Sequence, residues 1–331
     1  MPTRDRRVIS RWTLSGDPRG VAADSGTIYV GLRGPQSVVA IDAAAGRITR
    51  EVVLDSREIA STKDFETMRV DPVKRRLLIA QGSDESVSIL SLPDLAVIRE
   101  IGLEGEVVRD VLADPKGRYL FILGRTVHIW DADGNRQLRE ISTISPMAMA
   151  VSGDGSTLAI VGSERFGDVS ATVVALVDLS RLEETRREPL QTDRAVRSAL
   201  FARGSGALVV LAADWLAEKS LAPARERPMK AEAGGMRLLI DRADLVSSET
   251  ICLPEESTAQ IAAANGGIVY FAERRCTSAG TTVAAPRTVP TASLYGVEAV
   301  ALAYDDARGA LVATEKGGVL TLYRLPSPAK P

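Results

Sequence analysis

The sequence contains a single histidine, two cysteines and only 4% aromatic residues in 331 residues. With one histidine, neither a histidine-rich metal site nor a Ser-His-Asp triad can be assembled in the usual way. Lyases with a histidine base and haem proteins with a histidine axial ligand are disfavoured for the same reason. The lone His128 stands between Val127 and Ile129, so we expect a structural residue within a strand.

The chain also has little net charge and no long apolar run. Its net charge is −2, whereas nucleic-acid binders usually carry a strong basic excess, so we expect no nucleic-acid partner. No segment approaches the roughly 18 apolar residues of a membrane span. The charged residues 1–7 do not lead into a secretory signal, which predicts a cytoplasmic protein, or a periplasmic or secreted one if an export signal has been removed.

The two cysteines, Cys252 and Cys276, match no metal-binding spacing. They can form a disulfide in an oxidising compartment or stay reduced in the cytosol. We therefore expect neither a metal nor a cofactor.

A short turn followed by an apolar segment of four residues occurs seven times along the chain. These segments are 27–30, 77–80, 119–122, 158–161, 208–211, 268–271 and 311–314. Their mean spacing of roughly 45 residues is typical of propellers and solenoids. Further strand-like runs bounded by Gly, Pro, Asp and Asn follow in each repeat, and four antiparallel strands per repeat make a propeller blade.

The last repeat supplies only three strands, and residues 7–14 can supply the fourth, which would remove an open edge. We therefore predict an all-β fold: one seven-bladed β-propeller over residues 1–326, closed by the N-terminal strand, with 327–331 as a tail. The sixth blade has the weakest pattern. The expected blades are 15–55, 65–104, 106–142, 145–191, 195–254, 257–292 and 296–326 plus 7–14.

Two recurrent features carry a family resemblance. Segments 114–120 and 152–158 place an Asp-Pro or Asp-Gly turn before the second strand, and third strands end in Asp42, Asp131, Asp178 and Asp241. The pattern resembles the YVTN-type seven-bladed β-propellers, relatives of the WD40 class, over nearly the whole chain. The Thr-Asn pair of that family is missing after Val30, and the Gly-His dipeptide of WD40 repeats is absent. Such propellers bind proteins, carry cofactor-bearing partners or act as lactonases and lyases, so the resemblance implies a fold and leaves function open.

Aligning the repeats places one residue of each blade at an equivalent position at one mouth of the central channel. These residues are Arg19, Glu66, Arg109, Met147, Arg197, Gln260 and Val300. Because guanidinium groups hold carboxylates and phosphates bidentately, the arginines, with Glu66 and Gln260, predict a mouth that binds an anionic ligand. The alternative is a solvated channel in which Glu66 and Glu298 pair with the arginines. The excess of arginine opposes the divalent cation of a calcium-dependent lactonase.

Two segments depart from the repeat between the second and third strands of neighbouring blades, at 163–169 and 214–235. Apolar residues at 215–217, 221 and 222 predict one or two helical turns in the longer one. Aromatic residues, Met and Arg are enriched in interface cores. The candidate partner-binding residues are Arg165, Phe166, Trp215, Leu216 and Met229; the alternative is a loop that packs its tryptophan on its own blade.

These observations favour a non-catalytic protein-binding or scaffold propeller, a subunit or adaptor of a larger assembly. An alternative is a lactonase- or hydrolase-type enzyme at the channel mouth, acting on an anionic small molecule with Glu66 or Glu298 as base. A second alternative is the propeller subunit of a periplasmic redox complex whose cofactor sits on other chains.

Overall fold

The structure is a computed structural model in which the described residues form strands and no helix, which confirms the all-β prediction. The described residues are 7–34, 36–54, 65–81, 85–142, 144–166, 169–190, 196–202, 206–212, 215–219, 245–250, 261–263, 269–273, 291–295 and 297–324. They form six four-stranded sheets and one three-stranded sheet, and nearly every sheet is built from strands that follow one another in sequence.

The first four sheets are antiparallel meanders whose first strand lies innermost. The strands of sheets one and two are β2 (Asp17–Asp24), β3 (Thr27–Arg33), β4 (Ser37–Asp42), β5 (Arg47–Val53), β6 (Phe65–Asp71), β7 (Arg76–Gln81), β8 (Ser86–Ser91) and β9 (Val97–Gly102). Those of sheets three and four are β10 (Asp110–Ala113), β11 (Tyr119–Leu123), β12 (Val127–Asp131), β13 (Gln137–Ile141), β14 (Ser145–Val151), β15 (Thr157–Phe166), β16 (Val169–Asp178) and β17 (Glu183–Leu190).

The seventh sheet joins the two ends of the chain. Its order is β1-β27-β26-β25, so the N-terminal strand pairs antiparallel with the last strand, as the sequence predicts. The strands of the last three sheets are β18 (Val196–Phe201), β19 (Leu208–Ala212), β20 (Trp215–Lys219), β21 (Leu245–Thr250), β22 (Ile261–Ala263), β23 (Val269–Glu273), β24 (Thr291–Tyr295), β25 (Ala299–Asp305), β26 (Ala310–Glu315), β27 (Val319–Arg324) and β1 (Arg7–Thr13).

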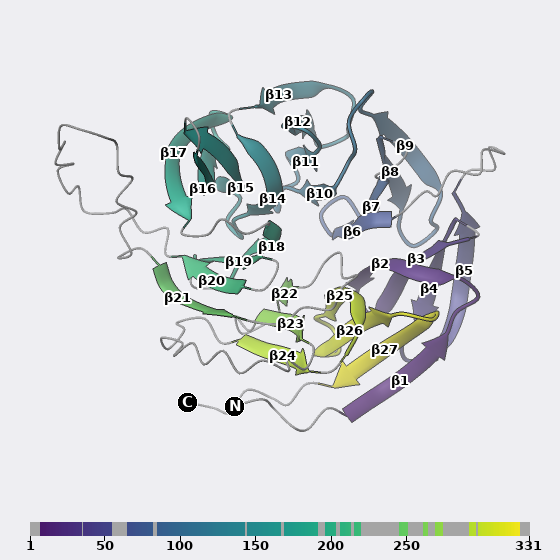
Figure 1. The fold of residues 1–331 in the computed structure, drawn as a ribbon. Helices are drawn as coiled ribbons and strands as arrows, with labels where there is room; N and C mark the ends of the chain where they lie inside the picture. The colour runs from purple at the N-terminus through teal and green to yellow at the C-terminus, as the bar shows by residue number, and fades with distance from the viewer. Residues whose placement is uncertain are drawn as a thin grey trace, which may run out of the picture.

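The sheets are arranged around a common centre, and the first strand of each meander, β25 in the seventh sheet, lies nearest to it (Figure 1). These first strands contact one another in sequence order, from β2 to β6, β10, β14, β18, β22 and β25, and β25 contacts β2. Any cavity at the centre is therefore lined by innermost strands, and each mouth is formed by one set of strand ends.

The hydrophobic core lies between neighbouring sheets. In β3, Ile28 and Val30 pack with residues of the seventh sheet, whereas Tyr29 between them packs with residues of the second. In β11, Leu120 faces the second sheet and Phe121 the fourth. Alternate side chains of a strand point to opposite faces, so second strands buried on both faces must be continuously apolar. This is the physical origin of the apolar segments whose side chains the structure describes.

Buried ion pairs connect some sheets beyond this core. At the end of β6, Asp71 accepts a hydrogen bond of 2.7 Å from Arg76, whose Nη2 also donates to the carbonyl oxygen of Ala132 in the third sheet at 2.7 Å. Both charged side chains are almost fully buried, at 1% and 7% exposure. The neighbouring Lys74 bonds Asp133 of the third sheet at 3.1 Å. These contacts link the β6–β7 turn of the second sheet to the third sheet.

The same Asp–Arg arrangement recurs after other innermost strands. Arg118 donates to Asp114 at 2.6 Å and reaches the carbonyl oxygen of Gly155 in the fourth sheet at 2.5 Å. Burial alone would raise the pKa of Asp114, but the hydrogen bonds from Arg118 and from backbone N–H groups outweigh it and hold that pKa below its ordinary value. A third pair joins Arg308 to Asp305 at 3.1 Å.

The fifth sheet corrects one prediction. Residues 215–219, expected to be helical, form strand β20, which pairs with β19 from Ala212 opposite Trp215 to Leu208 opposite Lys219. Only two residues of the sequence separate β19 from β20, so the long inserted segment of this sheet lies between β20 and β21, after the third strand instead of before it. In the sixth sheet, β24 pairs parallel to β23, an arrangement that the repeat pattern does not predict.

Candidate binding face and central cavity

The residues aligned from the sequence occupy β-bulges at the start of the innermost strands. The pairing register skips one residue in five of these strands, and the skipped residues are Arg19, Glu66, Met147, Arg197 and Val300. In the third sheet, Arg109 directly precedes β10 and donates its backbone N–H to Leu123 at 2.8 Å. A bulge re-aims the side chain of the unpaired residue and is frequent next to functional sites. We call these the bulge positions; Gln260 lies outside the described residues.

The three arginines at bulge positions have different surroundings. Arg19 forms an ion pair of 2.9 Å with Asp17, and its side chain is only 15% exposed. Arg109 donates to the backbone carbonyl of Pro146 in the fourth sheet at 3.1 Å. Arg197 is exposed on β18. Asp17 therefore neutralises Arg19 within β2, and the contact of Arg109 with Pro146 links the third sheet to the fourth.

The two candidate catalytic carboxylates sit at the same end of the strands. Glu66 is the bulge residue of β6, and its side chain lies outside the described part. Glu298 is exposed just before β25. In the part of the chain that the structure describes, no group of three or more His, Cys, Asp and Glu residues is placed to hold a metal ion.

The single histidine is buried in a polar cluster. His128 Nε2 lies 3.1 Å from a carboxylate oxygen of Glu106 and 3.1 Å from the hydroxyl of Thr126. Burial would raise the pKa of Glu106, but hydrogen bonds from His128 and from the backbone N–H of Arg125 lower it below its ordinary value. The cluster holds the segment before β10 against the β11–β12 hairpin, in keeping with the structural role expected for the histidine.

The β15–β16 hairpin extends beyond its sheet. Its strands pair from Thr157 opposite Asp178 to Phe166 opposite Val169. Within the described strands, β14 pairs only as far as Ser163 and β17 only as far as Thr172, so the tip is two-stranded. Since Ser163 pairs with the first residue of β14, the tip projects on the face that carries the bulge positions.

Charged residues brace the base of this hairpin. Arg187 on β17 forms ion pairs with Glu164 and with Glu184, the latter at 2.8 Å. Burial would lower the pKa of Arg187, but these two carboxylates raise it. Arg165 beside them is exposed. The hairpin is therefore held by its own sheet and presents Arg165 outward.

The remaining candidate residues lie elsewhere or outside the described part. The backbones of Trp215 and Leu216 belong to β20, and their side chains are not described. Met229, Cys252 and Cys276 lie outside the described residues, so the structure places neither this candidate partner-binding residue nor the two thiols. The described part contains no helix with the length and apolar character needed to cross a membrane.

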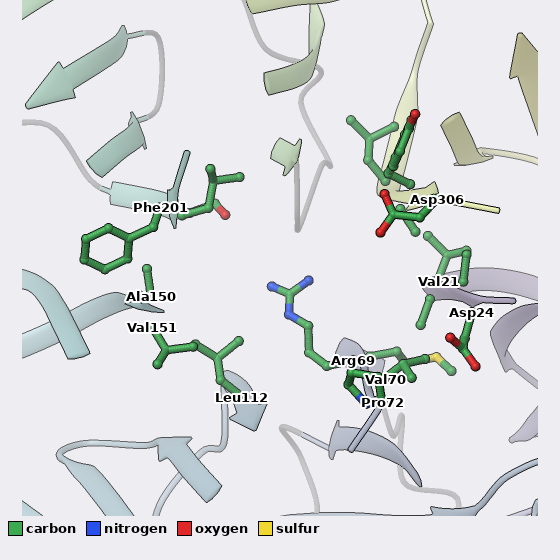
Figure 2. A pocket seen from close by; sticks show the side chains of 18 of the residues that line it. Val21, Asp24, Arg69, Val70, Pro72, Leu112, Ala150, Val151, Phe201 and Asp306 are labelled. Atoms are coloured by element: carbon green, nitrogen blue, oxygen red, sulfur yellow. The ribbon is translucent and has the colours of Figure 1, made fainter. Parts of the chain in front are cut away.

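A cavity of about 400 Å³ lies at the centre, toward the other ends of the innermost strands (Figure 2). Strands β2, β6, β10, β14, β18 and β25 all contribute to it. Its lining includes Val21, Leu112, Val151 and Phe201, together with Arg69. None of the described bulge residues is among the lining residues. The sequence alignment thus found one mouth of the channel, and the cavity opens nearer the other.

The cavity contains a ring that the sequence analysis missed. In six sheets, the residue three positions after the bulge residue, or after Arg109 in the third sheet, lines the cavity. These residues are Ala22, Arg69, Leu112, Ala150, Leu200 and Ala303. We call these the inner-ring positions. Their registers are equivalent; for example, Ala22 pairs with Tyr29 as Arg69 pairs with Leu78. Carrying the sequence alignment three residues further would have shown one arginine in a ring of alanine and leucine.

Comparisons with known proteins support the architecture. No family model matches the sequence, and no curated protein matches it. The β-propeller domain of Cps50 (Swd1) from Myceliophteria thermophila aligns with a TM-score of 0.66 and 13% identity, over 97% of this chain and 100% of that chain. Hydrazine synthase from Kuenenia stuttgartiensis aligns with a TM-score of 0.64 and 15% identity, over 97% and 98%. The chain therefore has a β-propeller fold.

Proposed function

We propose that this chain is a non-catalytic propeller that binds a protein partner as a subunit or adaptor of a larger assembly, and that its seven sheets are the blades of a closed ring of the YVTN type. The order of contacts among the innermost strands and the pairing of β1 with β27 support the ring. We expect this adaptor in the cytoplasm, which fractionation of its source cells would test.

The observation that carries the binding proposal is the projecting β15–β16 hairpin. Its two-stranded tip stands beyond the described strands on both sides, with Arg165 exposed and Phe166 at the last pair. Arg and aromatic side chains are enriched where protein interfaces concentrate their binding energy. The hairpin is braced by Arg187 and Glu164, so little order has to be gained when a partner binds.

The test is native mass spectrometry of the gently purified protein with cross-linking to its companion chains. We expect a reproducible companion whose cross-links cluster on the face of the hairpin. The double variant Arg165→Glu/Phe166→Ala should lose that companion. A matched control is Arg181→Glu, which reverses another exposed arginine of the same sheet, in the turn at its opposite end.

Two outcomes would contradict this proposal. One is a chain of 35.3 kDa without any companion. The other is a companion that the hairpin variant and the control variant retain equally well.

A further inference from the structure

The central cavity carries one unusual residue, Arg69. Five of the six described inner-ring positions are alanine or leucine, so this arginine is the single cation among the described residues that line the cavity. Figure 2 shows its guanidinium group directed into the cavity, away from the wall formed by β6. Its side chain is 30% exposed, which leaves the group accessible to a ligand.

The described residues satisfy few of the hydrogen-bond donors of the Arg69 guanidinium group. Among the described side chains its polar partner is Asp110, at 3.5 Å, the outer limit for a hydrogen bond. Asp110 itself is engaged more closely by the hydroxyl of Thr67 at 2.8 Å and by the backbone N–H of Val111 at 2.9 Å. By contrast, Arg76 at the start of β7 makes two hydrogen bonds of 2.7 Å, to Asp71 and to the carbonyl oxygen of Ala132. A guanidinium group has five N–H donors, so most of those on Arg69 face the cavity without a close partner from the described side chains.

The walls of the cavity restrict what this arginine could hold. On one side lie Leu112, Val151 and Phe201, which form an apolar surface (Figure 2). The carboxylates of Asp24 and Asp306 also line the cavity. These carboxylates, with Asp110 beside Arg69, repel a ligand with several negative charges, such as a phosphate monoester, more strongly than a ligand with a single negative charge. A volume of about 400 Å³ lies within the range of small-molecule sites.

We propose that the central cavity binds a small monocarboxylate with an apolar body, the carboxylate held bidentately by Arg69 and the body packed against Phe201 and Leu112. A planar carboxylate matches the fork of a guanidinium group, and the apolar wall removes the remainder of the ligand from water. The site is separate from the hairpin face, so it stands or falls independently of the proposed protein partner.

Isothermal titration calorimetry with 3-phenylpropionate and 4-methylpentanoate tests the proposal. The wild-type protein should bind both, and binding of the neutral 3-phenylpropionamide and of the dianion phenylsuccinate should be weaker by tenfold or more. Arg69→Gln should weaken binding of the monocarboxylates by about 10- to 100-fold, the range expected for charged hydrogen bonds. Arg69→Lys, which keeps the charge and loses the fork, should show an intermediate loss.

Arg136→Gln is the matched control, because it removes an exposed arginine in the β12–β13 turn, away from the cavity, and should leave the affinity unchanged. Unfolding curves recorded without ligand establish that each variant is folded. The proposal is overturned if the wild type binds neither carboxylate, if Arg69→Gln and Arg69→Lys bind as tightly as the wild type, or if the amide binds as well as the acid.

Discussion

Single residues decide how closely neighbouring strands of this fold can approach. Gly162 of β15 lies opposite Pro146, beside the bulge of Met147. A Cβ atom at Gly162 would overlap the carbonyl oxygen of Ser145 and come within 2.9 Å of the Cα atom of Pro146. Backbone atoms cannot move aside as a flexible side chain can, so the bulge depends on a glycine at this position.

Replacing Gly162 with alanine should therefore lower the free energy of unfolding by roughly 1–3 kcal/mol, because the new methyl group forces a shift in the backbone of β14. Urea unfolding followed by tryptophan fluorescence measures the change. Gly153→Ala is the control, since a Cβ atom at Gly153 meets no atom within 4 Å, and it should change stability by less than about 0.5 kcal/mol. Equal effects of the two substitutions would argue against the close approach.

The sequence predicted the positions of some site residues but not the contacts that they make, for a physical reason. A bulge is fixed by the local turn and recurs at one place in each repeat, so alignment could find Arg19 and Met147. The contacts of the bulge residues recur less regularly. Arg109 contacts Pro146 of the next sheet, which a single repeat does not contain, and the ion pair of Arg19 with Asp17 inside β2 was not predicted either. Arg69 was missed because its role arises only when strands from six sheets enclose one cavity.

At the scale of the strand and the sheet, predictions were best where burial is greatest. The apolar segments whose side chains the structure describes lie buried in second strands, and the sequence predicted each of these segments. Residues 215–217 were misread as helical because adjacent apolar residues do not distinguish a short helix from a strand. Because residues 215–219 pair with β19, they adopt the conformation of a strand. No local sequence pattern predicts the parallel pairing of β24 with β23.

The connection between sheets two and three offers a direct test of the buried Asp–Arg pairs. Asp71→Ala should cost about 3–5 kcal/mol of unfolding free energy, because it leaves the buried guanidinium group of Arg76 without its counter-charge. The double variant Asp71→Ala/Arg76→Met should recover part of that loss, since it removes the unpaired charge as well. Denaturant titration of both variants gives the comparison.

Asp94→Ala provides the control for this pair. Asp94 forms an ion pair with Arg50 at 3.6 Å, and both side chains are largely exposed, at 69% and 51%. Exposed pairs contribute at most about 1 kcal/mol, so this variant should unfold close to the wild type. If Asp71→Ala costs no more than Asp94→Ala, the buried pair does not hold the two sheets together.

At the scale of the whole molecule, the N-terminal strand covers the outer edge of β27. Its Trp12 also donates from Nε1 to the carbonyl oxygen of Gly46 in the first sheet at 3.1 Å, and packs with the core between the seventh and first sheets. Without β1 the backbone groups of β27 would form an exposed edge, which in other proteins pairs with further chains.

A variant without residues 1–13 should therefore unfold at a temperature lower by roughly 10 °C and should self-associate. Light scattering after size-exclusion chromatography and thermal unfolding measure the two effects. A variant without residues 1–6 keeps β1 intact and serves as the control. A monomeric protein with unchanged thermal stability after the longer deletion would show that β1 is dispensable.

The pairing of β1 with β27 has a consequence for how the protein is made. On the ribosome β1 emerges before all the other strands of these seven sheets, whereas its partner β27 emerges after them. In a linear array, each repeat can fold on the one before it and the ends remain independent. Here β1 stays without its partner while the strands from β2 to β26 are synthesised, and completion of the seventh sheet costs the loop-closure entropy of all the residues between β1 and β27. This sheet is therefore expected to form only after β27 has left the ribosome, and until then the unpaired β1 can be bound by a chaperone.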